Sequence, residues 1–265
     1  MKIGIIGGGN MGLALFKGMT KSGEYDERDF IISDINEKTL ENIKKNFDPD
    51  VTNVNAYLVE HSDIIVLAVV PNMIETVLTE IDRTLSSDHI IISFAAGVEI
   101  ARLTSYLTDK SLKIVRAMPN IPMSVGKGMT SVAFNDNCTD EDKDTVFKIF
   151  NSCGIVKEQE ERLFNLMTAL TGSGPALIFV FLEALADGAV KCGLSRDDAY
   201  LAAAQLMNGS SNLFLESKTH PGILKDNVCS PGGTAIEAIA TLEKNSFRYA
   251  VIEAIEKCAE KAGKM

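Results

Sequence analysis

Short apolar runs separated by amphipathic segments organise the first half of the chain. Runs of consecutive apolar residues are typical of strands buried on both faces of a parallel sheet. Segments with helical periodicity lie between them, the first at residues 13–21 and 36–45. This alternation predicts a doubly wound α/β domain, whose ligand belongs at the carboxyl ends of the strands. The expected strands are Ile3–Ile6, Phe30–Ser33, Ile64–Val69, Ile90–Phe94 and Ile114–Ala117.

The second half loses its strand signals from about residue 163. Helices are expected from Leu177 to Lys191, from Arg196 to Glu216 with Ser195 and Asp198 as a capping box, and from Thr234 to near Gly263. About a hundred residues of helices that are apolar on more than one face make too thin a domain to bury all of these faces. We therefore expect a second subunit to cover them. The fold class is therefore a Rossmann-like doubly wound parallel sheet at residues 1–160, followed by an all-helical domain at residues 161–265 for dimerisation.

Composition is that of a soluble globular protein. Of the 265 residues, 46% are hydrophobic and 23% are charged. The formal net charge of −10 argues against a nucleic-acid partner. Glu183 and Asp187 interrupt the apolar run Leu177–Leu182 before the roughly 18 apolar residues that a bilayer crossing needs, so no membrane span is expected.

The cysteines and the N-terminus indicate a cytoplasmic protein. The strand expected at Ile3–Ile6 leaves no room for an export signal. The five cysteines are widely spaced and form no Cys-x-x-Cys pair, and few histidines accompany them. They are interpreted as reduced thiols, with no metal site; they are Cys138, Cys153, Cys192, Cys229 and Cys258.

A glycine-rich turn, Gly7–Gly12, follows the first expected strand and opens the first expected helix. In a dinucleotide site, Gly7 permits the tight turn, Gly9 lets the backbone approach the pyrophosphate, and Gly12 lets the helix pack closely on the strand. Asp34 ends the second strand at about the distance expected for an acid that binds the adenosine ribose. The alternative for Asp34 is a cap on the helix at residues 36–45.

The loops after the later strands are candidates for the nicotinamide half of the cofactor. They are residues 68–71, 95–97 and 118–122. The small residues Ala95, Ala96 and Gly97 let a flat ring approach, and Asn120 offers a donor and an acceptor to a carboxamide. Short loops are rich in such residues in any α/β protein, so a purely structural role stays open for each.

The segment from His220 to Ala238 resembles an anion site at the start of the last helix. Ser230 is suited to cap that helix and Pro231 to its first position, while Gly232 and Gly233 bring the backbone close to a ligand such as a small carboxylate. A plain helix start is the alternative. His220 is expected to stabilise the turn rather than to act as an acid.

Six ordered blocks along the chain resemble the pyrroline-5-carboxylate reductase family. They are Gly7–Gly12, Phe94–Gly97, Arg116–Pro122, Thr171–Ala176, Glu183–Asp187 and Ser230–Gly233 within its C-terminal signature. The resemblance implies a Rossmann domain that binds NAD(P)H and a helical domain interlocked with a partner chain in a homodimer, with dimers often assembling into decamers. It also implies reduction of L-1-pyrroline-5-carboxylate to L-proline, the last step of proline biosynthesis.

The resemblance carries over contact residues as well. It places the substrate against Glu161, Ser230, Gly233, Thr234 and Ala235, with Thr234 and Ser230 as the catalytic candidates. The implied cofactor contacts are Gly7, Gly8, Gly9, Asn10, Met11, Gly12, Asp34, Asn55, Val69, Val70, Ala96, Asn120 and Asn227.

Three positions depart from the family pattern. Val70 stands where lysine is frequent, Asp34 where serine, threonine or a basic neighbour is frequent, and Ala235 where threonine is usual. Ala235 cannot bond the ring nitrogen, so Thr234, a water or a backbone group must do so. Because a carboxylate repels a 2′-phosphate, Asp34 favours NADH over NADPH.

Two other functions stay open. A related imine or hydroxyacid oxidoreductase is the first. A hydroxyacid dehydrogenase needs a lysine or histidine to handle the alcohol proton, typically on the helix that joins the domains, and Gly172–Ile178 offers neither. The second is a non-catalytic, dinucleotide-sensing protein.

Overall fold

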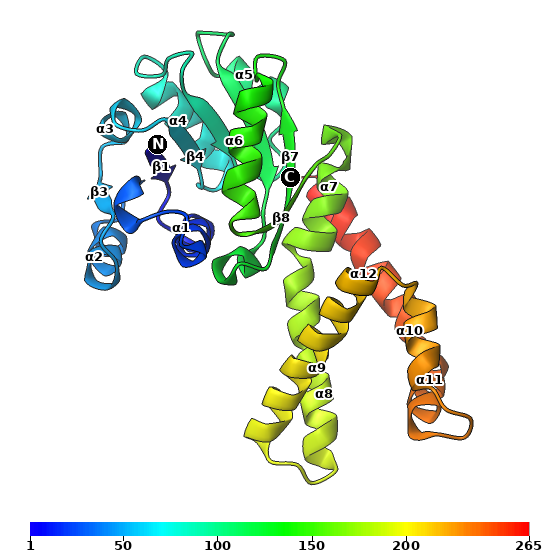
Figure 1. Cartoon of the computed structure of the whole chain (residues 1–265). Helices are drawn as coiled ribbons and strands as arrows, with labels where there is room; N and C mark the ends of the chain where they lie inside the picture. Colours follow the sequence, from blue (N-terminus) through cyan, green and yellow to red (C-terminus); the bar gives the residue numbers. More distant parts are fainter. Residues whose placement is uncertain (265) are drawn as a thin grey trace. The chain divides into compact units, whose positions relative to one another are not determined.

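The computed structural model describes residues 1–264, and these residues form two compact units. The sheet unit comprises residues 1–173 together with the C-terminal end from residue 258, and the helical unit comprises residues 174–257. Each unit is described by itself below, with the element labels of Figure 1.

The sheet unit is built on one eight-stranded sheet with the order β3-β2-β1-β4-β5-β6-β7-β8. The order reverses direction at β1, so the ends of β1 and β4 form the topological switch point where α/β sheets bind ligands. All neighbouring strands are parallel except β6 and β7, which are antiparallel. The strands are β1 (Ile3–Ile6), β2 (Phe30–Ser33), β3 (Asp50–Thr52), β4 (Ile64–Leu67), β5 (Ile90–Ser93), β6 (Lys113–Met118), β7 (Gly128–Phe134) and β8 (Gly154–Glu158).

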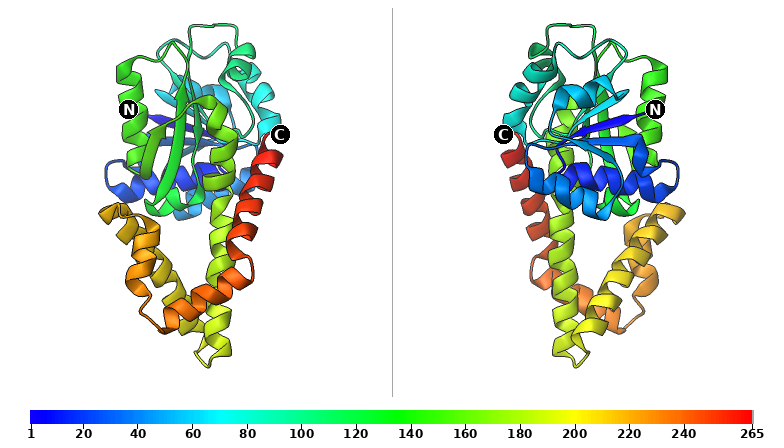
Figure 2. Two further views of the ribbon diagram at one scale, coloured as in Figure 1. Left: turned by 90° about the vertical axis from the view of Figure 1, so that its right-hand side faces the viewer. Right: turned by 90° about the vertical axis from the view of Figure 1, so that its left-hand side faces the viewer.

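Helices cover both faces of this sheet, as the two views of Figure 2 show. One core joins Ile3 and Ile5 of β1 to Leu15 of α1 and Phe150 of α6, and the opposite core joins Ile6 to helices α3, α4 and α5. Successive side chains of a strand point to opposite faces, and this explains why every position of β1 is buried. The helices are α1 (Asn10–Ser22), α2 (Glu37–Asn46), α3 (Asn55–Glu60), α4 (Ile74–Ile81), α5 (Ile100–Ser105) and α6 (Asp140–Asn151).

All five predicted strands are present, whereas β3, β7 and β8 were not predicted. β7 mixes small, polar and apolar residues, and β8 lies at the edge of the sheet with a mostly exposed pattern. Neither sequence shows the continuous apolar run or the strict alternation that predicts a strand.

The segment after β8 belongs to the sheet unit by its contacts. It contains η4 (Glu161–Leu163), α7 (Phe164–Met167) and η5 (Thr168–Gly172), a π-helical turn. Phe164 is fully buried against Met118 and Ala133 of the sheet. The contacts divide the chain between Ser173 and Gly174, whereas the expected boundary lies between residues 160 and 161. The buried ring of Phe164 explains the difference, because it attaches the segment to β6 and β7.

The helical unit begins with a long antiparallel pair, α8 (Gly174–Lys191) and α9 (Arg196–Ser217), visible in Figure 1. The predicted N-cap at Ser195 is confirmed, since its side chain accepts the Asp198 N–H. α10 (Pro221–Val228) follows, and α11 (Thr234–Lys244) and α12 (Phe247–Ala262) complete the chain.

One continuous helix from Thr234 to near Gly263 was expected, and this prediction is wrong. Ser246 adopts a left-handed conformation with φ of 57°, and this ends α11 before α12 begins. The apolar periodicity continues through the break, and for this reason the sequence pattern did not reveal it.

Large apolar side chains of the helical unit are widely exposed. Phe179, Val180, Leu201 and Tyr249 are each at least 64% exposed, while the hydrophobic residues buried among the described part of this unit are alanines. A surface of this kind marks an interaction site. The observation agrees with the expectation that a further surface covers these helices.

One helical run, Glu161–Lys191, is long and apolar enough to cross a bilayer by length and composition alone. The expectation that Glu183 and Asp187 keep the apolar stretch too short does not hold, because the helical run begins well before Leu177. A single helix of this kind is weak evidence for a membrane, since a helix that packs against another protein chain has the same composition.

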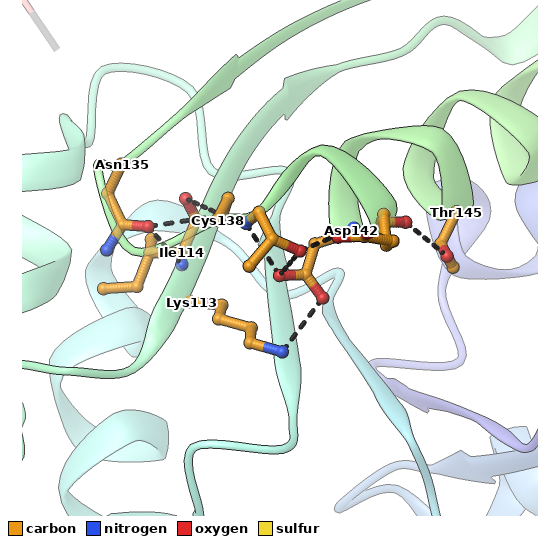
Figure 3. A network of polar contacts seen from close by, with 8 residues as sticks. Lys113, Ile114, Asn135, Cys138, Asp142 and Thr145 are labelled. Carbon is orange, nitrogen blue, oxygen red and sulfur yellow. Dashed lines mark hydrogen bonds and ion pairs between the residues drawn. The ribbon is translucent and has the colours of Figure 1, made fainter.

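The N-terminus of α6 is tied to β6 by a network of polar contacts (Figure 3). Thr139 and Asp142 form a capping box, and Asp142 also accepts from Lys113 Nζ at 2.9 Å. Burial opposes ionisation of Asp142, but the bonds from Lys113 and Thr139 outweigh it and lower the pKa of this carboxyl.

Two of the cysteines are shielded thiols. Burial raises the pKa of Cys138 to about 11, and burial likewise raises the pKa of Cys153 to about 11. Both thiols therefore stay protonated near neutral pH, and a thiol in that state is a poor nucleophile. All five cysteines are free, as expected, and no cluster with the composition of a metal site occurs among the described residues.

Candidate dinucleotide and substrate sites

The glycine turn between β1 and α1 has the predicted backbone geometry. Gly7 has a φ of 109°, and a Cβ there would lie 2.7 Å from the carbonyl oxygen of Ala68. A Cβ on Gly12 would lie 2.1 Å from the carbonyl oxygen of Gly7. The tight turn at Gly7 and the close helix packing at Gly12 are therefore confirmed.

Gly9 lies differently, because a Cβ there would meet no protein atom within 4 Å. Gly9 is the N-cap of α1 and provides no side chain to bond the first backbone N–H groups, which include those of Asn10, Met11 and Gly12. The open space and the uncapped helix end suit an anionic group such as a pyrophosphate. The turn thus fits the group that the sequence predicts there.

Asp34 lies against this turn. Its Oδ2 accepts the Gly8 N–H at 2.9 Å, and its Oδ1 accepts the Asn36 N–H at 2.8 Å. The helix-cap alternative for Asp34 is wrong, because Asn36 is the N-cap of α2 and its side chain accepts the Lys38 N–H. The carboxylate therefore stands beside the glycine turn at the end of β2, where an adenosine ribose binds in this fold.

Asn55 lies at the start of α3 and is anchored by its neighbours. Its Oδ1 accepts from Ser33 Oγ at 2.7 Å, and its Nδ2 donates to Glu80 at 3.0 Å. Val69 and Val70 follow β4 at the switch point, and Val70 is 61% exposed. An exposed valine offers an apolar contact there and no positive charge.

The loop after β5 forms a turn that leads into α5. Gly97 has a φ of 74°, which glycine adopts without strain, and Ala96 directly precedes it. Glu161 accepts the N–H of Ile100, the first residue of α5, at 2.8 Å. The same oxygen, Oε1, accepts from Arg116 Nη1 at 3.0 Å, so this carboxylate is already engaged within the sheet unit.

Arg116 was not predicted to have a role of its own. Its side chain is 2% exposed, lies over the Phe164 ring at 4.6 Å, and keeps a buried Nε without a partner among the described residues. A signal existed in the sequence, since an arginine inside the apolar run Ile114–Ala117 must be paired if the strand is buried. Glu161, Arg116 and Gly97 also line a cavity of about 330 Å³.

Asn120 is held inside the sheet unit. Its Oδ1 accepts the Met129 N–H at 2.9 Å, and its Nδ2 donates to the Thr171 carbonyl at 3.0 Å. These bonds join the loop after β6 to β7 and to the π-helical turn. Because an amide can make further bonds, the predicted contact to a carboxamide stays a prediction.

The Ser230–Gly233 segment differs from the expected helix start. α11 begins at Thr234 with Gly233 as its N-cap, so the predictions of Ser230 as the cap and Pro231 as the first helical residue are wrong. Ser230 instead closes a turn in which its carbonyl accepts the Gly233 N–H at 3.0 Å, with Gly232 at a φ of 68°. The glycines that permit this turn thus shift the helix start beyond Pro231.

The shifted start leaves an open helix end. No side chain bonds the first turn of α11, so the backbone N–H groups of Thr234 and Ala235 have no capping partner. These N–H groups and the partial positive charge of an 11-residue helix form an anion-binding arrangement. Thr234 is exposed beside it, and Asn227 is exposed on the neighbouring α10.

His220 has the structural role that was expected. Its Nδ1 accepts the Gly222 N–H at 3.1 Å, and this bond caps α10. Because Nδ1 accepts this hydrogen bond within the turn, the structure agrees with the prediction that His220 stabilises the turn.

A Rossmann-type sheet with an uncapped glycine turn, joined to a helical unit with an open anion site, defines a two-domain nucleotide-dependent oxidoreductase architecture. Comparison with known proteins narrows this class. Residues 161–265 match the family model of pyrroline-5-carboxylate reductase dimerisation, and residues 2–97 match that of NADP oxidoreductase, coenzyme F420-dependent.

Full-length relatives agree with these matches. Pyrroline-5-carboxylate reductase of Escherichia coli is 41% identical over 264 residues, covering 100% of this chain and 98% of the relative. Human pyrroline-5-carboxylate reductase 2 is 39% identical, covering 97% of this chain and 81% of the relative. A Plasmodium falciparum pyrroline carboxylate reductase crystallised with NADP bound has a TM-score of 0.89 at 36% identity, covering 100% of this chain and 97% of that one. The chain belongs to the pyrroline-5-carboxylate reductase family.

Proposed function

We propose that the protein reduces L-1-pyrroline-5-carboxylate to L-proline with a reduced nicotinamide dinucleotide, the last step of proline biosynthesis. Family membership over the whole chain is the observation that carries the proposal. The uncapped glycine turn supports a dinucleotide, and the uncapped start of α11 supports a small carboxylate. A cytoplasmic location is part of the proposal.

The cofactor is assigned to the sheet unit. The turn Gly7–Gly12 receives the pyrophosphate, Asp34 and Asn55 receive the adenosine ribose, and Val69 and Val70 line the switch point. The nicotinamide is assigned to Ala96 and Asn120, with Asn227 as a further contact. The bound cofactor supplies the hydride.

The substrate is assigned to the turn before α11. Its carboxylate accepts from the backbone N–H groups of Thr234 and Ala235, with Gly233 and Ser230 beside them. A protonated imine is already an electrophile, so the site needs no general acid to activate it. As hydride adds to the imine carbon, the C=N π electrons become the lone pair of the ring nitrogen. The chain contributes mainly the orientation of the two reactants.

Thr234 is the residue assigned to the ring nitrogen. It is exposed at the first position of α11, and its neighbour Ala235 has no hydrogen-bonding side chain. A hydroxyl both donates and accepts, so Thr234 suits the nitrogen before and after reduction.

NADH is the preferred cofactor in this proposal, and a homodimer is the minimal assembly. Asp34 stands beside the glycine turn with its carboxylate held by two backbone N–H groups. The exposed apolar side chains of the helical unit suit an interlocked partner chain, and such dimers are expected to associate further, up to decamers.

Two measurements test the proposal. The purified protein, mixed with NADH and pyrroline-5-carboxylate, should consume the cofactor and form proline in equal amounts. Gly9→Ala should then weaken NADH binding at least about tenfold while the melting temperature stays unchanged, since the new Cβ meets no protein atom within 4 Å. Tight NADH binding without any turnover would favour a dinucleotide-sensing protein instead.

A further inference from the structure

The Glu161 carboxylate links three separate elements of the sheet unit. It lies in η4, directly after the sheet, and its Oε1 accepts both from Arg116 of β6 and from the backbone of Ile100. Ile100 is the first residue of α5, and the nicotinamide loop at residues 95–97 lies just before it in the chain. Glu161 thus joins the buried sheet to the end of that loop.

Arg116 makes this link rigid. Its guanidinium lies over the Phe164 ring at 4.6 Å and is 2% exposed, so it has one well-defined position. Glu161 is 30% exposed and receives both donors on one oxygen. Arg116 therefore holds the Glu161 carboxylate in place, and the carboxylate in turn holds the backbone N–H of Ile100.

Few other polar bonds hold the loop close to α5. Gly97 is in a left-handed conformation, and the turn from Ala95 to Val98 is closed by a long bond of 3.5 Å between Val98 N and the Ala95 carbonyl. The N-cap of α5, Glu99, makes no side-chain cap bond. Ala95 and Val98 are buried in the core, so the bond from Ile100 N to Glu161 is the polar restraint at the α5 end of residues 95–99.

We propose that Glu161 is a positioning residue for the nicotinamide loop, acting from Arg116 through the backbone of Ile100, and that it does not contact the substrate. The inference rests on the proposed function in placing the nicotinamide at Ala96. It replaces the substrate contact that the family resemblance implied for Glu161. The bond to Ile100 requires an oxygen acceptor, whereas the negative charge of Glu161 serves to pair the buried Arg116.

Substitutions at Glu161 separate the two roles. Glu161→Gln keeps an oxygen that can accept from both donors, and Glu161→Ala removes it. We expect Glu161→Ala to raise the dissociation constant for NADH about tenfold and to leave the KM for pyrroline-5-carboxylate within about twofold. Glu161→Gln should stay close to wild type in both, with a lower melting temperature because Arg116 loses its counter-charge. The matched control is Glu160→Ala, whose carboxylate pairs with Arg162 at the surface.

Ile100→Pro tests the backbone link without changing the ion pair. Proline suits the first position of a helix, and Glu99, with φ of −78° and ψ of 156°, has the conformation that a residue before proline adopts. This variant removes the N–H and should weaken NADH binding as Glu161→Ala does. It also serves if Glu161→Ala does not fold.

NADH affinity is measured by fluorescence titration, and the KM values by turnover of the intact enzyme. A wild-type protein that binds NADH but does not reduce the imine refutes the proposed function and leaves the titrations interpretable. The positioning role is refuted if NADH affinity is unchanged in both Glu161→Ala and Ile100→Pro. It is also refuted if Glu161→Gln raises the KM for the imine as much as Glu161→Ala does, since that result shows a charge acting on the substrate.

Discussion

Replacing Asp34 with serine should reverse the cofactor preference. The carboxylate is fixed by the N–H groups of Gly8 at 2.9 Å and Asn36 at 2.8 Å, so it cannot swing away from a phosphate placed beside the glycine turn. A ribose 2′-phosphate bound there brings negative charge next to that carboxylate, whereas the two hydroxyls of NADH donate hydrogen bonds to it.

The size of the effect follows from the position of the group. Two unit charges about 4 Å apart interact by about 1 kcal/mol in water and about 4 kcal/mol at an effective dielectric constant of about 20. Asp34 is half-buried, so a value of about 2 kcal/mol is appropriate. This corresponds to a change of about thirtyfold in the ratio of kcat/KM for NADH to kcat/KM for NADPH.

The assay compares kcat/KM for both cofactors in the wild type, in Asp34→Ser and in Asn36→Ala. Asn36→Ala is the matched control, because it removes the cap of α2 and leaves the charge in place. It should lower the melting temperature without moving the cofactor ratio. A wild-type preference for NADPH, or an Asp34→Ser variant with an unchanged ratio, would refute the reasoning.

Three further outcomes are expected. Thr234→Val should lower turnover about tenfold or more through loss of one hydrogen bond to the ring nitrogen, and unchanged turnover would clear Thr234 of that role. Light scattering should show a dimer or larger assembly at micromolar concentration, and a folded monomer would contradict the interpretation of the exposed helices. Asp142→Asn should lower the free energy of unfolding by about 1–2 kcal/mol at neutral pH. The pKa of Asp142 is lowered from 3.8 in the folded state, so its contribution to the free energy of unfolding is present above that pH and is lost as the pH falls further. If Asp142→Asn and the wild type still differ in full in their free energy of unfolding at pH values well below 3.8, this assignment is refuted.

The sheet was predictable where burial dominates the sequence. Strands such as β1 and β4 are buried at every position, so their apolar runs predict them without any knowledge of the fold. β7 and β8 depend on pairing partners distant in the chain, and β8 exposes most of its residues at the edge of the sheet. Their local sequences carry too little of that information.

The candidate sites show the same limit. The roles of Gly7 and Gly12 follow from the glycine spacing together with its place between the first strand and the first helix. The start of α11 was misplaced because Ser-Pro at residues 230–231 matches a helix start locally, while the conformation of Gly232 defers the helix to Thr234. The link from Glu161 to Arg116 joins residues 45 positions apart, and no local pattern reveals such a contact.

Transfer of deuterium tests the central claim most directly. NADH carrying deuterium at the transferred position of the nicotinamide is mixed with the protein and unlabelled L-1-pyrroline-5-carboxylate, and the product is analysed by mass spectrometry and NMR. We predict L-proline with one deuterium per NADH consumed, on the ring carbon that adjoins nitrogen and does not carry the carboxylate. Oxidation of NADH without labelled proline, or proline without deuterium at that carbon, would contradict the account.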